Sequence, residues 1–274
     1  MNRRRWLLAA VVSWSLVGCS PSGNATPVTS ATAAAVATPT GTASPSPTAV
    51  VTPSPSAAAL PQGSETITLD PAQFAGVALD HPYWPMNVGS VWVYRATDAD
   101  GAVQKVEITV TNKTKQILGI TATVVHDIVT EDGETVEDTL DWYAQDATGN
   151  LWYLGEDTKE YDGGKVVSTE GSWEGGVDGA QPGILLPADP AVGVAYRQEY
   201  YAGQAEDAAE VLSLAEHVKV PFGTYDGVLQ TRETTALEPD LVEQKFYATG
   251  VGNILSVDIS GGSGREELLS FKPG

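Results

Sequence analysis

The sequence predicts an all-β domain, an antiparallel meander of two internal repeats that forms a curved sheet, a half-barrel or a sandwich after a stalk predicted to be disordered. Three observations predict this fold. Apolar and polar residues alternate with period two in many short segments, as in half-buried strands. Turn-forming steps such as Asp-Gly separate these segments. The segment 85–154 also resembles 189–257 in sequence, which indicates a duplicated unit.

The first nineteen residues predict export and a lipid anchor. Arginines at 3–5 precede an apolar run over 6–17, and Gly18 stands before Cys19. The run is about a dozen residues and a membrane-spanning helix needs about 20, so 1–18 are predicted to be a cleaved signal peptide. Leu-Val-Gly-Cys, ending at Cys19, resembles the bacterial lipobox. That resemblance implies a diacylglycerol on the Cys19 thiol and a protein anchored outside the cytoplasm in a bacterial cell envelope.

Residues 20–63 predict a spacer between this anchor and a folded domain. Ala, Thr, Pro and Ser fill 34 of these 44 positions, and no charged or aromatic residue is present. Such a segment cannot bury enough apolar surface to offset the entropy of ordering it. The predicted organisation is therefore a signal peptide over 1–18, the lipidated cysteine and linker over 19–63, and a β domain over 64–274.

The predicted β domain is strongly acidic. Residues 1–64 hold three arginines and no acid, so the remainder has 12 basic residues against 35 acidic ones, a net charge of −23. This charge repels phosphate, which argues against a nucleic-acid partner. A single cysteine and three isolated histidines give no spacing typical of a metal site, so neither a metal nor a cofactor is predicted.

The β domain is predicted to open with one short helix, in which Asp70 caps the N-terminus and Pro71 takes the first position. Alternation then predicts strands around 106–110, 140–144 and 255–259. The segment 205–217 consists mainly of good helix formers. The repeat aligns it with the strand around 106–110, so we predict a strand there as well.

The two repeats, 85–154 and 189–257, align at an offset of 104 residues. Each copy predicts a meander of about five strands, antiparallel because the connections are short. Residues 155–188 form an insert with a hairpin at Asp162-Gly163-Gly164. The alignment predicts three equivalent pairs, which are Trp92 with Tyr196, Trp142 with Phe246, and Asn150 with Asn253.

No catalytic motif is present, so no catalytic residue is assigned. Carboxylates are the abundant reactive groups, and in the insert they alternate with tryptophans. Aromatic faces beside carboxylates suit sugar binding, because a sugar ring stacks on the aromatic face and its hydroxyl groups donate hydrogen bonds to the carboxylates. His126 lies next to Asp127, but neighbours on a strand point to opposite faces and cannot act as a pair. The candidate ligand surface consists of Trp152, Glu156, Trp173, Glu174 and Asp178.

Three segments resemble a group of bacterial secreted proteins and lipoproteins. They are Asp-Trp-Tyr-Ala-Gln-Asp over 141–146, Gly-Asn-Leu-Trp-Tyr-Leu-Gly-Glu over 149–156, and Gly-Ser-Trp-Glu-Gly-Gly-Val-Asp-Gly over 171–179. The resemblance covers most of 81–271. It implies a β-rich domain of the cell envelope and supplies no activity or site residue.

The sequence favours a non-enzymatic protein that presents an acidic β domain to an envelope partner or a small ligand. One alternative is a carbohydrate-active hydrolase that uses carboxylates of the insert. Another is a carrier that holds a lipid-like molecule in the concavity of the sheet. Two close, partly buried carboxylates near an exposed tryptophan would favour the hydrolase, and small apolar residues facing a cavity would favour the carrier.

Replacing Cys19 by alanine is expected to release the protein from membranes or to block removal of the signal peptide. Each buried methylene contributes about 0.8 kcal/mol, so two or three acyl chains hold the native protein firmly. Membrane fractionation and the mass of the N-terminal peptide measure this. A processed, acylated and membrane-bound Cys19→Ala protein would contradict lipidation at this cysteine.

Overall fold

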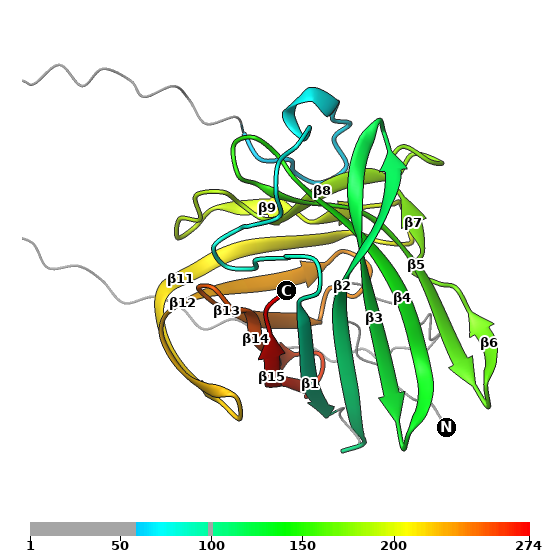
Figure 1. The fold of residues 1–274 in the computed structure, drawn as a ribbon, viewed down its shortest axis with the longest axis vertical. Coiled ribbons are helices and arrows are strands. Elements are labelled where there is room, and N and C mark those ends of the chain that lie inside the picture. Colours follow the sequence, from blue (N-terminus) through cyan, green and yellow to red (C-terminus); the bar gives the residue numbers. More distant parts are fainter. Residues whose placement is uncertain (1–58, 98–100) are drawn as a thin grey trace, which may run out of the picture. The chain divides into compact units, whose positions relative to one another are not determined.

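The computed structural model describes residues 59–97 and 101–274. The predicted signal peptide, Cys19 and the linker up to residue 58 lie outside the described residues. The described part forms one antiparallel sheet of fifteen strands (Figure 1). The strands are β1 Val91–Thr97, β2 Val103–Ile117, β3 Ile120–Glu131, β4 Glu134–Gln145, β5 Leu151–Asp162, β6 Lys165–Ser168, β7 Trp173–Glu174, β8 Gln181–Leu186, β9 Ala195–Arg197, β10 Glu199–Tyr200, β11 Asp207–Val220, β12 Gly223–Thr235, β13 Val242–Ala248, β14 Gly252–Ser260 and β15 Arg265–Lys272.

The strand order confirms the prediction of an all-β, antiparallel meander. The sheet runs β10-β8-β5-β4-β3-β2-β1-β15-β14-β13-β12-β11-β9, and β6 and β7 pair with β5. It is one continuous and strongly curved sheet, so the predicted sandwich of two sheets is not the form adopted. The C-terminal strand β15 lies between β1 and β14 and joins the two meanders.

The two ends of the curved sheet come together at a seam. Residues 195–200 cross it, because β9 pairs with β11 while β10 pairs with β8. Between them, the Gln198 amide donates to the Asp207 carbonyl at 2.8 Å. The sheet is thus nearly closed, and one face of each long strand is turned toward a shared interior.

The predicted short helix is confirmed as a 3-10 turn, η1, over Pro71–Gln73. The Asp70 side chain accepts a hydrogen bond from the Ala72 amide at 3.0 Å, so Asp70 is the N-cap as expected. Within the described residues, no helix combines the length and the apolar character needed to cross a membrane.

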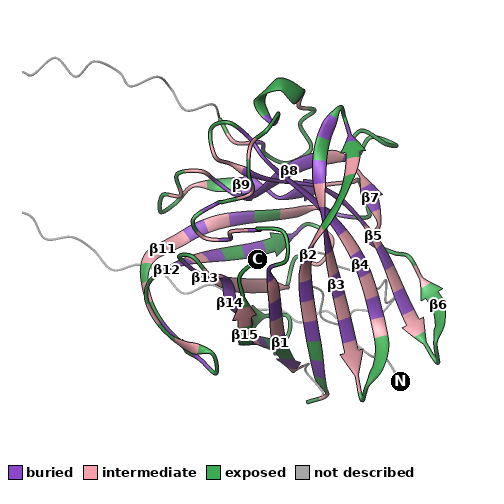
Figure 2. Cartoon of the chain, viewed as in Figure 1, coloured by how far each residue is buried: buried purple, intermediate pink, exposed green. Residues whose placement is uncertain are grey.

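Aromatic side chains fill one part of the interior. Buried and less buried residues alternate along the long strands (Figure 2). Trp84, in the segment before β1, lies 6.2 Å from Trp92, 6.5 Å from Tyr143 and 5.9 Å from Tyr247, measured between ring centroids. Each such pair contributes about 0.5–1.5 kcal/mol beyond its area burial. Trp84 therefore connects β1, β4 and β13 across the interior.

The two predicted copies correspond to β1–β5 and to β9 with β11–β14, which follow each other in the same order along the sheet. Trp92 and Tyr196 are both fully buried, and Trp142 and Phe246 lie on the corresponding strands β4 and β13. The duplication itself stays a prediction.

The expected equivalence of Asn150 and Asn253 is wrong. Asn150 lies in the turn before β5, where its side chain binds Asp146 and the Ala188 amide. Asn253 lies inside β14 opposite Tyr247. The turn between β13 and β14 is shorter than the turn between β4 and β5, so the aligned asparagines fall at different points.

The strand prediction for 205–217 is confirmed, because β11 covers most of this segment. β11 pairs with β9 on one side and β12 on the other, and Ala209 and Val211 are buried. Pairing on both edges outweighs the helix propensity of the residues.

Two predicted boundaries differ from the structure. The insert was expected to begin at residue 155, but β5 runs unbroken from 151 to 162 and pairs with β6 through the predicted hairpin, Asp162 opposite Lys165. The domain was expected to begin at 64. Leu60 already packs against the core, and the Pro61 carbonyl accepts from the Arg197 amide at 2.7 Å, so the contacts begin at 60.

A β-bulge in β5 decides which side chains enter the interior. Asp141 pairs with Glu156 and Tyr143 pairs with Tyr153, so β5 has one residue more than β4 between these pairs. The extra residue turns Tyr153 and Glu156 to the same face. Gly155, with φ +135°, lies in the bulge, and a Cβ there would be 2.4 Å from the Trp173 carbonyl oxygen.

Replacing Gly155 by alanine is expected to lower the free energy of unfolding by about 3 kcal/mol, because the new methyl group meets the backbone of β7 and the φ value is strained. Urea unfolding measures the loss. Gly164→Ala is the matched control, since Gly164 also has a positive φ of +75° but nothing within 4 Å of an added Cβ. Equal losses in both variants would contradict a specific need for glycine at the bulge.

Candidate functional site

The bulge brings two carboxyl groups onto one phenol. The Tyr153 hydroxyl lies 2.8 Å from Asp141 Oδ1 and 2.8 Å from Glu156 Oε2. A phenol carries one proton, so it can donate to only one of these carboxylates. The second contact requires a proton on a carboxyl group. Asp141 and Glu156 are thus arranged to hold at least one proton between them.

These two residues belong to a larger group of carboxyl groups, which we call the acidic cluster. Its members come from six different strands and interact electrostatically with one another. The charge of Glu266 on β15 raises the pKa of Asp127 on β3, although β2 and β1 separate their strands, so the two carboxyl groups interact across the interior. The acidic cluster consists of Asp127, Asp141, Glu156, Glu199, Asp207 and Glu266.

Burial and mutual repulsion shift the titration of the cluster. Burial raises the pKa of Asp141 to about 7 and of Asp207 to about 7. Burial and the nearby Glu243 raise the pKa of Glu266 to about 8. For Asp127, burial and then the charge of Asp141 raise the pKa well above its ordinary value. The cluster therefore holds protons at pH values where exposed carboxyl groups have lost them.

The charge of Lys245 lowers the pKa of Asp207 and Glu266, but this lysine forms no ion pair with the cluster. Lys245 on β13 is buried, but its ammonium group binds Glu233 at 2.7 Å and Glu243 at 3.3 Å, outside the cluster. No ion pair with a lysine, arginine or histidine involves a member of the cluster among the described residues.

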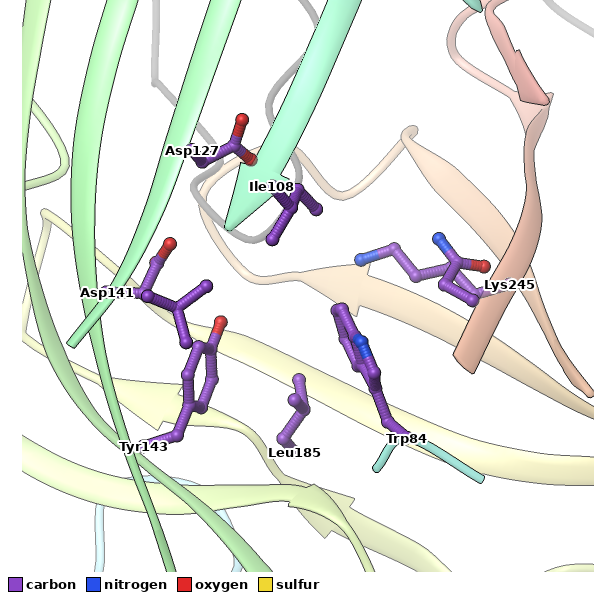
Figure 3. Close-up of a pocket in the computed structure, with 9 residues that line it drawn as sticks. Trp84, Ile108, Asp127, Asp141, Tyr143, Leu185 and Lys245 are labelled. Carbon is purple, nitrogen blue, oxygen red and sulfur yellow. The ribbon is translucent and has the colours of Figure 1, made fainter. Parts of the chain in front are cut away.

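A small cavity opens beside the cluster. It has a volume of about 20 Å³, room for one water-sized group. Asp127, Asp141, Tyr143, Lys245 and Trp84 point into the same space (Figure 3). We call it the central cavity. Its wall is completed by Ile108, Val125, Leu185 and Asn253.

Several buried polar atoms around the cavity have no hydrogen-bond partner among the described residues. On the cavity wall these are Asp127 Oδ1 and Asn253 Oδ1, which accept, and Trp84 Nε1, which donates. In the rest of the cluster they are single oxygens of Glu156, Glu199, Asp207 and Glu266. Leaving a buried polar atom unsatisfied costs about 1–3 kcal/mol. The acceptors outnumber the donors, which favours an occupant that brings N–H or O–H groups.

The acidic cluster does not have the arrangement of a metal site. Among the described residues, no three His, Cys, Asp or Glu side chains are grouped so that they could hold a metal ion. An occupant of this region would therefore be held by hydrogen bonds and charge.

The five residues predicted to form a ligand surface do not come together on one surface. Trp152 and Trp173 are buried and donate their indole N–H groups to Asp146 and Glu199 at 2.7 Å. Glu156 is buried in the acidic cluster. Glu174 is half-buried and pairs with Lys115 at 2.8 Å, while Asp178 is exposed.

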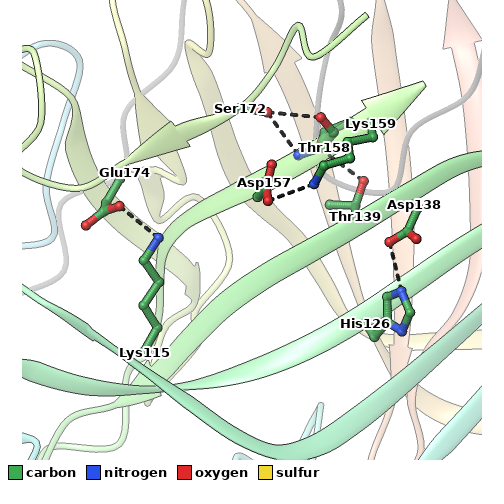
Figure 4. A network of polar contacts seen from close by, with 9 residues as sticks. All are labelled: Lys115, His126, Asp138, Thr139, Asp157, Thr158, Lys159, Ser172 and Glu174. Carbon is green, nitrogen blue, oxygen red and sulfur yellow. Dashed lines mark hydrogen bonds and ion pairs between the residues drawn. The ribbon is translucent and has the colours of Figure 1, made fainter. Parts of the chain in front are cut away.

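Figure 4 shows ion pairs of β2, β3, β4 and β5 that lie outside the acidic cluster. Lys115 reaches Glu174, Lys159 binds Asp157 at 2.8 Å, and His126 binds Asp138 at 2.9 Å. His126 and Asp127 thus lie on opposite faces of β3, as expected for neighbours on a strand, with Asp127 inside. The carboxyl groups of the acidic cluster, by contrast, form no ion pair with a basic side chain within the part of the chain that the structure describes.

Of the acidic cluster, only Glu156 was singled out from the sequence. Asp127 and Asp141 occur in alternating strands and look like ordinary exposed acids until the sheet is known to close. Gly155 was the one local signal, since a glycine inside a strand pattern indicates a bulge. That bulge explains why Glu156 faces inward beside Tyr153.

Comparison with known proteins adds two distant structural likenesses. No protein-family model matches the sequence, and no curated protein matches it. A protein from Bacteroides fragilis, described as exported and as having a YmcC-like fold, is 14% identical over 69% of this chain and 98% of its own, with a TM-score of 0.42. A protein from Parabacteroides distasonis, described as a lipoprotein, is 11% identical over 70% of this chain and 99% of its own, with a TM-score of 0.38. The fold assignment rests on the strand order of this chain.

Raising the pH from 5 to 8 is expected to destabilise the domain. Asp141 and Asp207 have a pKa of about 7 in the folded chain and about 4 in the unfolded chain, so the folded state holds more protons between these values. The free energy of unfolding then falls as the pH rises. His81, whose pKa is lowered by burial, acts in the opposite direction but is a single group. We expect a Tm at least about 4 °C lower at pH 8 than at pH 5.

Asp141→Asn tests the origin of this effect, because it keeps an acceptor for Tyr153 and removes one titrating group. Its Tm should fall less between pH 5 and 8 than that of the unmodified protein. Asp178→Asn removes an exposed carboxyl group and should leave the full decrease. A Tm that is constant or rises over this range would contradict proton storage in the cluster.

Proposed function

We propose that this protein is an exported, lipid-anchored protein of a bacterial cell envelope that binds, without catalysis, a ligand carrying a protonated amino group. We infer the class of ligand from the acidic cluster. Its six carboxyl groups form no ion pair among the described residues, and five of them have a buried oxygen without a hydrogen bond. An ammonium group supplies both the charge and the N–H donors that these oxygens lack.

The size of the site supports a small cationic group. The central cavity holds one water-sized group, which matches an ammonium headgroup and excludes a bulky ring. Tyr143 and Trp84 line the same cavity, and aromatic faces attract cations. The lipid anchor and envelope location rest on the sequence ending at Cys19 and on the linker that follows it.

The two alternatives have weaker support. Asp141 and Glu156 are close enough to share one phenol, as a hydrolase pair would require. Both are buried, however, and among the described residues no exposed tryptophan lies beside them. A lipid carrier needs an apolar cavity the size of an acyl chain. The central cavity is far smaller, and charged side chains form part of its wall.

Methylammonium chloride, added at pH 8, is expected to raise the Tm of the protein. A ligand at a hundred times its Kd stabilises the folded state by about 2.7 kcal/mol, which corresponds to a rise of about 5–10 °C for a domain of this size. Differential scanning fluorimetry over a concentration series measures it.

Tetramethylammonium chloride at the same concentrations is the matched control, because it has the same charge but no N–H group and a larger volume. Asp127→Asn should lose the methylammonium effect, whereas Asp178→Asn should keep it. Equal effects of the two salts would show general screening and would contradict a site for an ammonium group.

A further inference from the structure

The seam is held by few backbone pairs. β9 pairs with β11 at three positions and β10 pairs with β8 at two, whereas β1 and β2 pair at seven. The backbones nevertheless approach closely, since a Cβ on Gly183 of β8 would lie 2.3 Å from the Gln198 carbonyl. Because so few backbone pairs hold the seam, its closure depends on additional contacts.

That support comes from the segment 60–67, which we call the strap. The Pro61 carbonyl accepts from the Arg197 amide at 2.7 Å, and Gln62 Nε2 donates to the Ala195 carbonyl at 2.5 Å, both on the β9 side. On the β8 side, the Ile67 amide donates to Gln181 Oε1 at 3.2 Å. The strap therefore holds both sides of the seam.

Arg197 makes the seam depend on the strap. Only 1% of its surface is exposed, and its guanidinium donates to three carbonyl oxygens, those of Gly63, Glu65 and Pro182, at 2.7–2.9 Å. Two of these three carbonyls belong to the strap. A buried guanidinium that loses them needs water instead, because an unsatisfied buried charge is costly. Release of the strap thus favours movement of Arg197 outward.

Movement of Arg197 would displace residues that belong to the acidic cluster or bind to it. Glu199 follows Arg197 by two residues in the segment 195–200, which crosses the seam. Its carboxyl group belongs to the acidic cluster and accepts a hydrogen bond from Trp173 Nε1 at 2.7 Å. Gln198, between them, binds the backbone of Asp207, another member of the cluster. The same three residues therefore connect the strap outside with the carboxyl groups inside.

We propose that the strap is a releasable closure of the seam and that its release opens the acidic cluster to solvent. The strap overlaps the C-terminal end of the predicted linker, so a partner or a pull on the linker acts directly on it. This inference concerns the opening of the sheet and does not depend on which ligand the cluster binds.

Hydrogen exchange of the full chain tests the closure. Arg197→Lys keeps the charge but removes the fork that spans the carbonyls. We expect amide exchange in 181–186 and 195–211 to rise by about tenfold or more, while 103–145 keeps its protection, because only the seam opens. Arg95→Lys is the matched control, since Arg95 forms an exposed pair with Glu267 away from the seam and should change neither region.

A second variant loosens the strap and keeps the Arg197 side chain. Gln62→Ala with Glu65→Ala removes the bond from Gln62 to Ala195 and the bond from the Gln62 amide to Glu65 Oε1. It should produce the same local rise in exchange. Unchanged exchange at the seam in both variants, or an equal rise in all regions, would overturn the proposal. Binding of methylammonium by the unmodified protein is measured separately, so failure of the two proposals can be told apart.

Discussion

The sheet curves until the inner faces of distant strands meet, and this near-closure determines the character of the interior. Each long strand contributes every second side chain to a shared space that water reaches poorly. Carboxyl groups that are far apart in sequence and in strand order therefore become electrostatic neighbours. Asp127 and Glu266 show this, because two intervening strands separate them along the sheet but not across it.

The strands could be predicted from the sequence because alternation and turn residues act locally. Helix propensity and the repeat alignment disagreed at one segment, and strand pairing decided its structure. Segment 205–217 has helix formers, yet neighbours on both edges make it a strand. The site was much harder to predict. Glu156 was recognised as a candidate, but a one-residue bulge turned it from the expected surface to the interior. Trp84 lies in a segment without periodicity, so nothing local indicated that it would span the interior.

The protonation of the interior changes how the composition should be interpreted. The sequence has a formal charge of −20, with every carboxyl group counted as ionised. Burying six ionised carboxylates together would cost far more than a domain's total stability. Protons held by these groups, as between Asp141 and Glu156 on Tyr153, reduce the negative charge of the folded interior. The effective charge of the folded domain at neutral pH is therefore less negative than its composition suggests.

The position of β15 sets the order in which this fold can assemble. Thr97 in the first strand pairs with Arg265 in the last, and the same last strand pairs with β14 on its other side. Contacts between residues so distant in sequence form slowly, because a long loop must close first. Without β15, β1 and β14 each have an unpaired edge, and the two meanders are joined through the seam alone.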